Sequence, residues 1–184
     1  MAAKGGAKRV LVAYASTHGH TAKIAGRVAE AVRAAGLEAE VRELGEAAEV
    51  DPGAYDGVIA GASLHQGKHQ PELVEWVRAN RKALEDRPAG FFSVSLTAAE
   101  DTEEARAATR ECLDGFLEET GWSPAMTAMF AGALQYREYD FFTRKLIRLM
   151  MKRGGHPTDT SRDYEYTDWD AVDRFAEELA GRVS

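Results

Sequence analysis

An apolar run that changes abruptly into a polar, glycine-containing loop is the strongest constraint on the fold of this chain. Residues Arg9–Ala15 are almost all apolar, and Ser-Thr-His-Gly-His-Thr follows at positions 16–21. A near-continuous apolar run is typical of a parallel strand that is covered by helices on both faces. From Thr21, apolar residues recur at four-residue spacing as far as Gly36, which predicts a helix that ends there. The chain therefore begins as strand, loop and helix.

The alternation of strand and helix continues along the chain. The pattern predicts further strands at 37–41, 57–63, 90–96 and 127–134, and further helices from Pro71, from Asp101 to about Thr120, and near the end of the chain. Thr167 and Asp170 have the spacing of a capping box at the start of that last helix, as Asp101 and Glu104 have earlier. The strand at 37–41 alternates apolar and polar residues, which predicts an outer position in the sheet.

These elements predict one α/β domain. The right-handed crossover rule favours a doubly wound parallel sheet of five strands in the order 2-1-3-4-5, with a helical insertion after the fifth strand. We expect a disordered tail at 1–8, a single domain at 9–184 and the insertion at about 136–165. In this topology the ligand crevice opens between the first and third strands, where the winding reverses direction.

Charge and cysteine content exclude several classes of protein. The formal net charge of −7 argues against nucleic acid as a partner, because neutralising phosphates needs a basic surface. Cys112 is the single cysteine, so no internal disulfide forms and nothing requires an oxidising compartment. No apolar run reaches the ~18 residues of a membrane-spanning helix. We expect a cytoplasmic protein whose oligomeric state the sequence leaves open, with a homo-oligomer among the alternatives.

The loop at 16–21 has the chemistry of an anion site. It joins a buried strand to a helix amino terminus and so gathers hydroxyl groups and free backbone N–H groups at one point. It lacks the lysine of the nucleotide-binding P-loop and the three glycines of the dinucleotide fingerprint, so FMN suits it better than ATP or NAD. The residues expected to hold the phosphate are Ser16, Thr17, His18, Gly19, His20 and Thr21.

The spacing of Ser16, Gly19 and Thr21 resembles the first loop of flavodoxins. That resemblance implies that the loops after the third and fourth strands flank the flavin ring, through Ala62, Ser63, Leu64, His65, Gly67, Ser95, Leu96 and Thr97. Neither tryptophan nor tyrosine occurs in these loops, whereas low-potential flavodoxins stack both on the ring. An open flavin face favours an enzyme over an electron carrier. His65 and His69 are the candidates for a proton acceptor, and no metal site is expected.

Residues 140–153 form a basic amphipathic segment, with five basic residues against one acidic. At helical spacing, Phe142, Leu146, Ile147, Leu149, Met150 and Met151 share one broad arc, with cations opposite. Three interpretations stay open: an ordinary surface helix, contact with an anionic membrane, or a pocket for an apolar, carboxylated substrate. The helix is too short to cross a bilayer. The residues nominated for substrate or membrane contact are Tyr136, Arg144, Lys145, Arg148 and Lys152.

The second half of the chain resembles a more specific family. Gly-Ala-Leu-Gln-Tyr at 132–136, the run at 145–152, Gly154-Gly155, Thr-Asp-Thr at 158–160 and Tyr-Thr-Asp-Trp at 166–169 are similar to the signature of menaquinone-dependent protoporphyrinogen IX dehydrogenases. The resemblance implies FMN-dependent oxidation of protoporphyrinogen IX, with electrons passed to menaquinone or another quinone, at the inner face of the cell membrane. The alternatives are an NAD(P)H:quinone oxidoreductase of the flavodoxin superfamily and a non-enzymatic FMN electron carrier.

Overall fold

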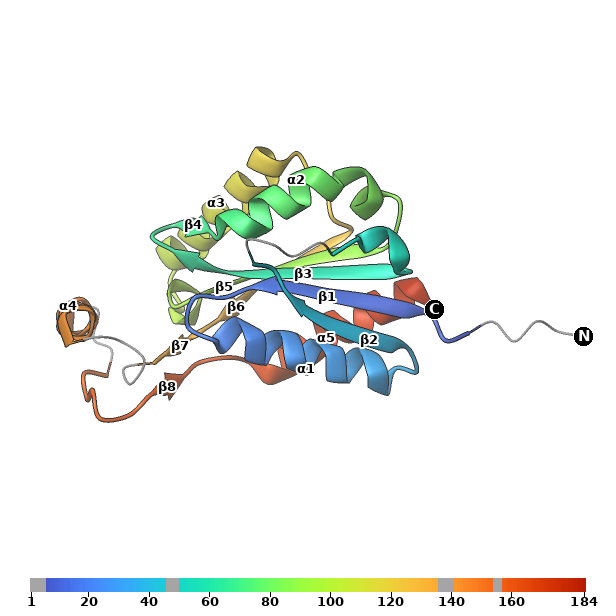
Figure 1. Ribbon diagram of the computed structural model, residues 1–184. Coiled ribbons are helices and arrows are strands. Elements are labelled where there is room, and N and C mark those ends of the chain that lie inside the picture. The colour runs from blue at the N-terminus through green and yellow to red at the C-terminus, as the bar shows by residue number, and fades with distance from the viewer. Residues whose placement is uncertain (1–5, 46–49, 136–140, 154–156) are drawn as a thin grey trace, which may run out of the picture.

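The structure is a computed structural model that describes residues 6–45, 50–135, 141–153 and 157–184. A twisted sheet lies between two layers of helices, with α2 (Pro71–Glu85) and α3 (Glu103–Thr120) on one face (Figure 1). On the other face lie α1 (His20–Ala34) and α5 (Trp169–Val183). Two short 3₁₀ helices, η1 (Pro52–Ala54) and η2 (Thr97–Ala99), lie in connections.

The central sheet has the predicted doubly wound topology. Its five parallel strands are β1 (Arg9–Ala15), β2 (Glu38–Glu43), β3 (Gly57–His65), β5 (Ala89–Ser95) and β6 (Met126–Ala131). They lie in the order β2-β1-β3-β5-β6, which is the predicted order 2-1-3-4-5, and β2 is at the edge as expected. The prediction of a flavodoxin-like sheet is therefore confirmed.

Both faces of the central strands are buried, which explains their continuous apolar sequences. Val10 and Val12 of β1 pack with Phe92 toward α1 and α5, whereas Leu11 packs with Phe91 toward α2 and α3. All five side chains have no exposed surface. Such burial on both sides is what a parallel sheet covered by helices requires.

The region after β3 is more regular than the sequence indicated. β3 continues through His65 and turns at Gln66 and Gly67 into β4 (Lys68–His69), which pairs antiparallel with it. The expected loop at 62–69 is therefore a short hairpin. Gln66 and Gly67 both have positive φ values, of 52° and 77°, and the glycine adopts its value without a side-chain penalty.

The expected fifth strand, 127–134, is two strands. β6 stops at Ala131, and β7 (Ala133–Leu134) leaves the sheet to pair antiparallel with β8 (Tyr164–Glu165). The break lies at Gly132, whose N–H donates to the Ser95 carbonyl over 3.0 Å and whose carbonyl accepts from the Tyr166 N–H over 3.1 Å. One residue thus ties the main sheet to the β7–β8 ribbon.

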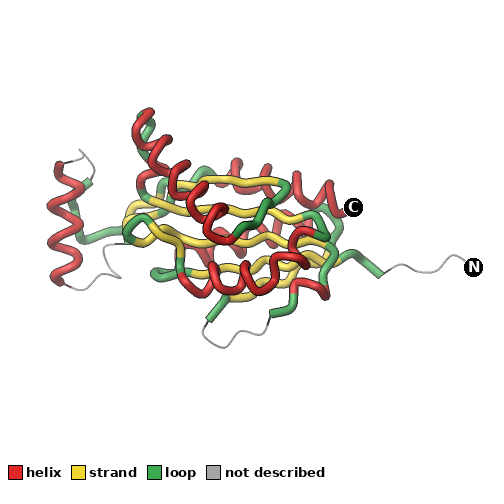
Figure 2. The backbone as a smooth tube through the Cα atoms, turned by 90° about the horizontal axis from the view of Figure 1, so that it is seen from above, coloured by secondary structure: helices red, strands yellow, loops and turns green. Residues whose placement is uncertain are grey.

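The insertion extends away from the body on this ribbon. Its helix α4 (Phe141–Arg153) lies apart from the sheet and its covering helices in both views (Figures 1 and 2). Ile147 and Met151 of α4 pack with Leu134, which is fully buried. A small apolar cluster therefore connects the helix to the ribbon.

The starts of two helices differ from the predicted capping boxes. Thr102, rather than Asp101, caps α3, because its hydroxyl accepts the Ala105 N–H over 3.1 Å. Asp168, rather than Thr167, caps α5 by accepting the Ala171 N–H over 3.0 Å. The hydroxyl of Thr167 is consequently available for other contacts.

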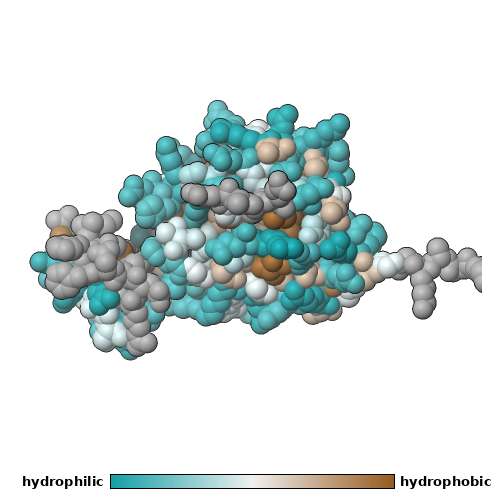
Figure 3. All heavy atoms as spheres, in the orientation of Figure 1, coloured by the Kyte–Doolittle hydropathy of each residue, from teal (hydrophilic) through white to brown (hydrophobic). Residues whose placement is uncertain are grey.

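The face of the molecule seen in Figure 3 is mainly hydrophilic, with a few apolar atoms near the middle of the body. Within the described ranges, no helix combines the length and the apolar character needed to cross a membrane.

Candidate flavin site

The carboxyl ends of β1, β3, β5 and β6 enclose a crevice of about 100 Å³. It lies at the predicted position, beside the loop that joins β1 to α1. Ten of the residues predicted to bind the cofactor line it: Ser16, Thr17, His18, His20, Thr21, Ser63, Leu64, His65, Ser95 and Leu96. Residues from the loop after β1 and from the ends of β3 and β5 thus meet at one site.

The loop after β1 leaves a helix amino terminus open to an anion. Gly19 adopts a left-handed conformation (φ 81°), and its N–H donates to Ser16 Oγ over 2.9 Å. Among the described residues, no side chain caps α1, and its first turn contains no acidic residue. The N–H groups of a first turn have no partners within the helix and carry partial positive charge. An anionic group such as the phosphate of FMN fits this position, because it supplies the missing acceptors.

His20 points toward the insertion. Its Nε2 lies 2.7 Å from Thr167 Oγ1, and the same hydroxyl lies 2.8 Å from the Ala131 carbonyl. Thr167 has one hydroxyl hydrogen, which goes to that carbonyl, so the hydroxyl accepts from Nε2–H of His20. Burial lowers the pKa of His20 although Glu165 opposes this effect, which favours the neutral ring.

Gln70, which the sequence analysis did not nominate, connects two walls of the crevice. Its Nε2 donates to Thr17 Oγ1 over 3.1 Å and to Ser63 Oγ over 2.6 Å. Gln70 precedes Pro71 at the start of α2, so the phosphate loop, β3 and α2 are held together at one side chain.

Residues 132–135, which we term the start of the insertion because they lead into it from β6, form another wall that the sequence prediction missed. Gly132, Ala133 and Gln135 line the crevice, as does Val94 of β5. A signal for it was present, because the fifth strand neighbours the fourth in the predicted order and ends at the same edge of the sheet. The insertion and the cofactor loops are therefore parts of one site.

Four predicted cofactor residues do not line the crevice. Ala62 is fully buried in β3, where alternate side chains point into the sheet's packed faces. Gly67 forms the hairpin turn, and Thr97 begins η2. Gly19 acts through its backbone conformation at the start of α1.

His69, nominated with His65 as a proton acceptor, does not line the crevice. The residue is 7% exposed, and its ring packs edge-on against Phe91 and Phe116, with centroid distances of 5.3 and 5.0 Å. Its Nε2 lies 2.9 Å from Ser93 Oγ. The reason is the β3–β4 hairpin, which turns the chain back so that His69 faces α3, while His65 lines the crevice. In the described part of the chain, no group of three His, Cys, Asp or Glu residues could hold a metal.

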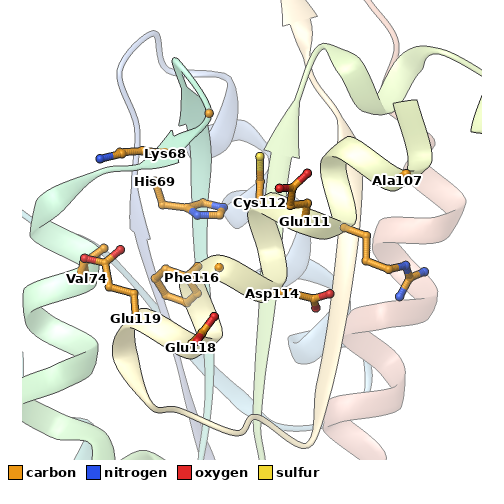
Figure 4. A pocket seen from close by; sticks show the side chains of 13 residues that line it. Lys68, His69, Val74, Ala107, Glu111, Cys112, Asp114, Phe116, Glu118 and Glu119 are labelled. Carbon is orange, nitrogen blue, oxygen red and sulfur yellow. The ribbon is translucent and has the colours of Figure 1, made fainter. Parts of the chain in front are cut away.

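His69 borders a second cavity, of about 730 Å³, between the hairpin and α3 (Figure 4). Its charged lining has two cations, Lys68 and Arg110, and four carboxylates, those of Glu111, Asp114, Glu118 and Glu119. This lining is unfavourable for a carboxylated substrate, because like charges repel.

His69 is expected to make folding sensitive to mild acid. Burial lowers its pKa to about 4, against about 6.5 in the unfolded chain, so the unfolded state binds more protons as the pH falls through 6.5. The free energy of unfolding should therefore fall by about 2 kcal/mol between pH 7 and pH 5 from this residue alone. Urea unfolding at pH 7 and at pH 5 measures this change in the free energy of unfolding.

The matched variant is His69→Phe with Ser93→Ala, which removes the titrating group and its partner but keeps an aromatic ring. Its carboxylates are those of the wild type, so the difference between the two proteins isolates His69. Equal loss of stability between pH 7 and 5 in both proteins would contradict the prediction.

The insertion helix presents three of the nominated cations to solvent. Lys145, Arg148 and Lys152 are exposed, whereas Arg144 is partly buried. The predicted division into one apolar arc and one basic arc is only partly correct, because Leu149 is 50% exposed. Tyr136 lies outside the described residues.

Comparisons with known proteins agree with this architecture. The family model of the flavodoxin domain matches residues 11–161. Protoporphyrinogen IX dehydrogenase [quinone] of Escherichia coli (strain K12) is 33% identical over 172 residues, which cover 94% of each chain. The protein of the same name from Leishmania major is 34% identical over 173 residues, covering 94% of this chain and 74% of that protein. This chain belongs to the protoporphyrinogen IX dehydrogenase [quinone] family, among the flavodoxin-domain proteins.

Solved structures place this dehydrogenase-family chain in the flavodoxin fold. Oxidised Flavodoxin 1 from Bacillus cereus matches with a TM-score of 0.58 and 16% identity, over 96% of this chain and 99% of that one. A short-chain flavodoxin associated with a bacterial microcompartment matches with a TM-score of 0.61 and 15% identity over the same shares. Together with the family match, they confirm the prediction of a flavodoxin-like FMN protein.

Proposed function

We propose that this chain oxidises protoporphyrinogen IX to protoporphyrin IX and passes the electrons to a membrane quinone. The observation that carries the proposal is one crevice in which the phosphate loop meets the start of the insertion. The names and the 33–34% identity of the relatives support the substrate and the acceptor.

The residues of the crevice suit this chemistry. The amino terminus of α1, with the hydroxyls of Ser16, Thr17 and Thr21, would hold the phosphate of FMN. When bound, FMN supplies two-electron redox chemistry. The strand ends that border the crevice contribute small or aliphatic residues such as Ser63, Leu64 and Leu96, whose side chains suit contact with a flat, apolar substrate.

His65 is the remaining candidate for a proton acceptor. It lines the crevice and its side chain is exposed, so an imidazole nitrogen can take up a proton and return it to solvent. His69 packs against Phe91 and Phe116 instead of lining the crevice, so it is no longer a candidate for this role.

Purified protein loaded with FMN should turn over protoporphyrinogen IX with a menaquinone analogue. The measurement is anaerobic bleaching of the flavin absorbance by protoporphyrinogen, followed by its recovery when the quinone is added. A flavin that protoporphyrinogen never reduces would refute the proposal. Bleaching by NADH or NADPH instead would establish an NAD(P)H:quinone oxidoreductase, and a stable one-electron form at low potential would indicate an electron carrier.

The second part of the proposal is that the protein contacts an anionic membrane, at the inner face of the cell membrane. The exposed cations Lys145, Arg148 and Lys152 and the exposed Leu149 lie on one short helix outside the body. Cations and apolar side chains on one helix suit the interface of an anionic membrane, where a quinone is found.

A further inference from the structure

We propose that His20 and Thr167 are positioning residues that couple the cofactor loop to the insertion, so that binding of FMN stiffens the start of the insertion. The inference rests on the proposed flavin site and adds a conformational link between that site and the arm. It assigns to His20 a task different from direct contact with the phosphate.

The first step of the argument is a continuous chain of hydrogen bonds. His20 is the first residue of α1, and its Nε2–H donates to Thr167, which donates to the carbonyl at the end of β6. His20 is 8% exposed, so solvent competes little for this bond. Thr167 lies two residues after the end of β8, the strand through which the insertion returns.

The second step is a parallel contact between the same two elements. Lys23 of α1 pairs with Glu165 of β8, which also accepts from Trp169 Nε1 over 2.9 Å. The Lys23 ammonium lies 5.3 Å from the Trp169 ring centroid. This pair is more exposed than His20 and so contributes less. It nevertheless fixes β8 against the first turns of α1.

The third step is thermodynamic. FMN bound at the start of α1 would restrain His20, which is hydrogen-bonded to Thr167, so part of the binding free energy would be coupled to the position of the insertion. Coupling is reciprocal: breaking the link must weaken FMN binding and must also remove the effect of FMN on the insertion. If Thr167 only stabilised the fold in general, its replacement would not remove the effect of FMN on the insertion.

The test is Thr167→Val, which keeps the shape of the side chain but removes the hydroxyl. The Kd for FMN, measured by fluorescence quenching, should rise about 3- to 10-fold, the effect of one lost hydrogen bond. In the wild type, FMN should slow hydrogen exchange of the Gly132 and Tyr166 amides, whose bonds hold the ribbon to the sheet. In Thr167→Val this slowing should disappear, while the Lys23 amide in α1 stays protected by FMN.

Two controls separate the link from ordinary destabilisation. Thr167→Ser restores the hydroxyl and should behave as the wild type. Thr109→Val makes the same change at a buried threonine of α3, whose hydroxyl donates to the Ala105 carbonyl over 2.9 Å, and should leave FMN binding unchanged. If Thr167→Val fails to fold, His20→Leu serves for the exchange measurement, since it keeps the bond from Thr167 to Ala131.

Distinct outcomes bear on the two proposals. A wild type that takes up no FMN removes the proposed function itself. A wild type that binds FMN without slowing exchange at Tyr166, or a Thr167→Val variant with unchanged Kd and unchanged exchange, overturns the coupling alone.

Discussion

Replacing Lys145, Arg148 and Lys152 by glutamate is expected to abolish binding to anionic vesicles while leaving FMN bound. Each cation near an anionic surface contributes about 1 kcal/mol, so loss of three costs about 3 kcal/mol and a factor of 100 or more in affinity. The new carboxylates add repulsion. All three side chains are exposed on α4, outside the crevice, so the fold and the flavin site should be unaffected.

Sedimentation with phosphatidylglycerol vesicles measures this binding, and added salt should weaken wild-type binding because it screens the charges. The matched control reverses three exposed cations of the body, Arg33, Lys82 and Arg110, and so makes the same change in net charge. Equal losses in the two triple variants would mean that overall charge, rather than α4, governs the interaction. Unchanged binding by the α4 variant would remove the helix from membrane contact.

The sheet could be predicted from the sequence because its signals are local and strong. Strands covered on both faces are apolar throughout, as in β1, and a strand at the edge alternates, as in β2. The fifth strand was predicted to continue to residue 134 because Leu134 is apolar, like the buried residues of the main sheet. Its burial comes from α4 and the β7–β8 ribbon, and contacts between segments so far apart in sequence leave no local pattern.

The site was predictable where its residues follow strand ends and unpredictable where they depend on long-range pairing. The loop after β1 could be recognised as an anion site because hydroxyl residues and a glycine directly precede a helix. His65 and His69 looked equivalent in the sequence, yet one hairpin register sends them to different sides of the sheet. Thr167 looked like a helix cap, but Asp168 takes that role and leaves Thr167 to bond His20.

Gly61→Ala is expected to be among the most damaging single substitutions in the central sheet. A Cβ at Gly61 of β3 would lie 2.0 Å from Cζ of Phe92. The Phe92 ring is fully buried and packs near Phe130 and Phe175, with ring centroids 5.7 and 6.4 Å away, so it has no room to retreat. Overpacking of this kind should lower the free energy of unfolding by about 3 kcal/mol. Urea unfolding of the protein without FMN measures it.

A second substitution tests whether this clash is the cause. Phe92→Leu alone leaves a void and is destabilising, but in the double variant with Gly61→Ala the new methyl group occupies part of that void, so the two effects should be strongly non-additive.

Gly26→Ala in α1 is the matched control: nothing lies within 4 Å of its added Cβ, and alanine favours a helix, so it should stabilise by about 0.5–1 kcal/mol. Additive losses for Gly61→Ala and Phe92→Leu would show that the ring does not limit Gly61. Because β3 also carries Ser63 and Leu64 to the crevice, non-additivity in stability should be matched by non-additivity in FMN affinity.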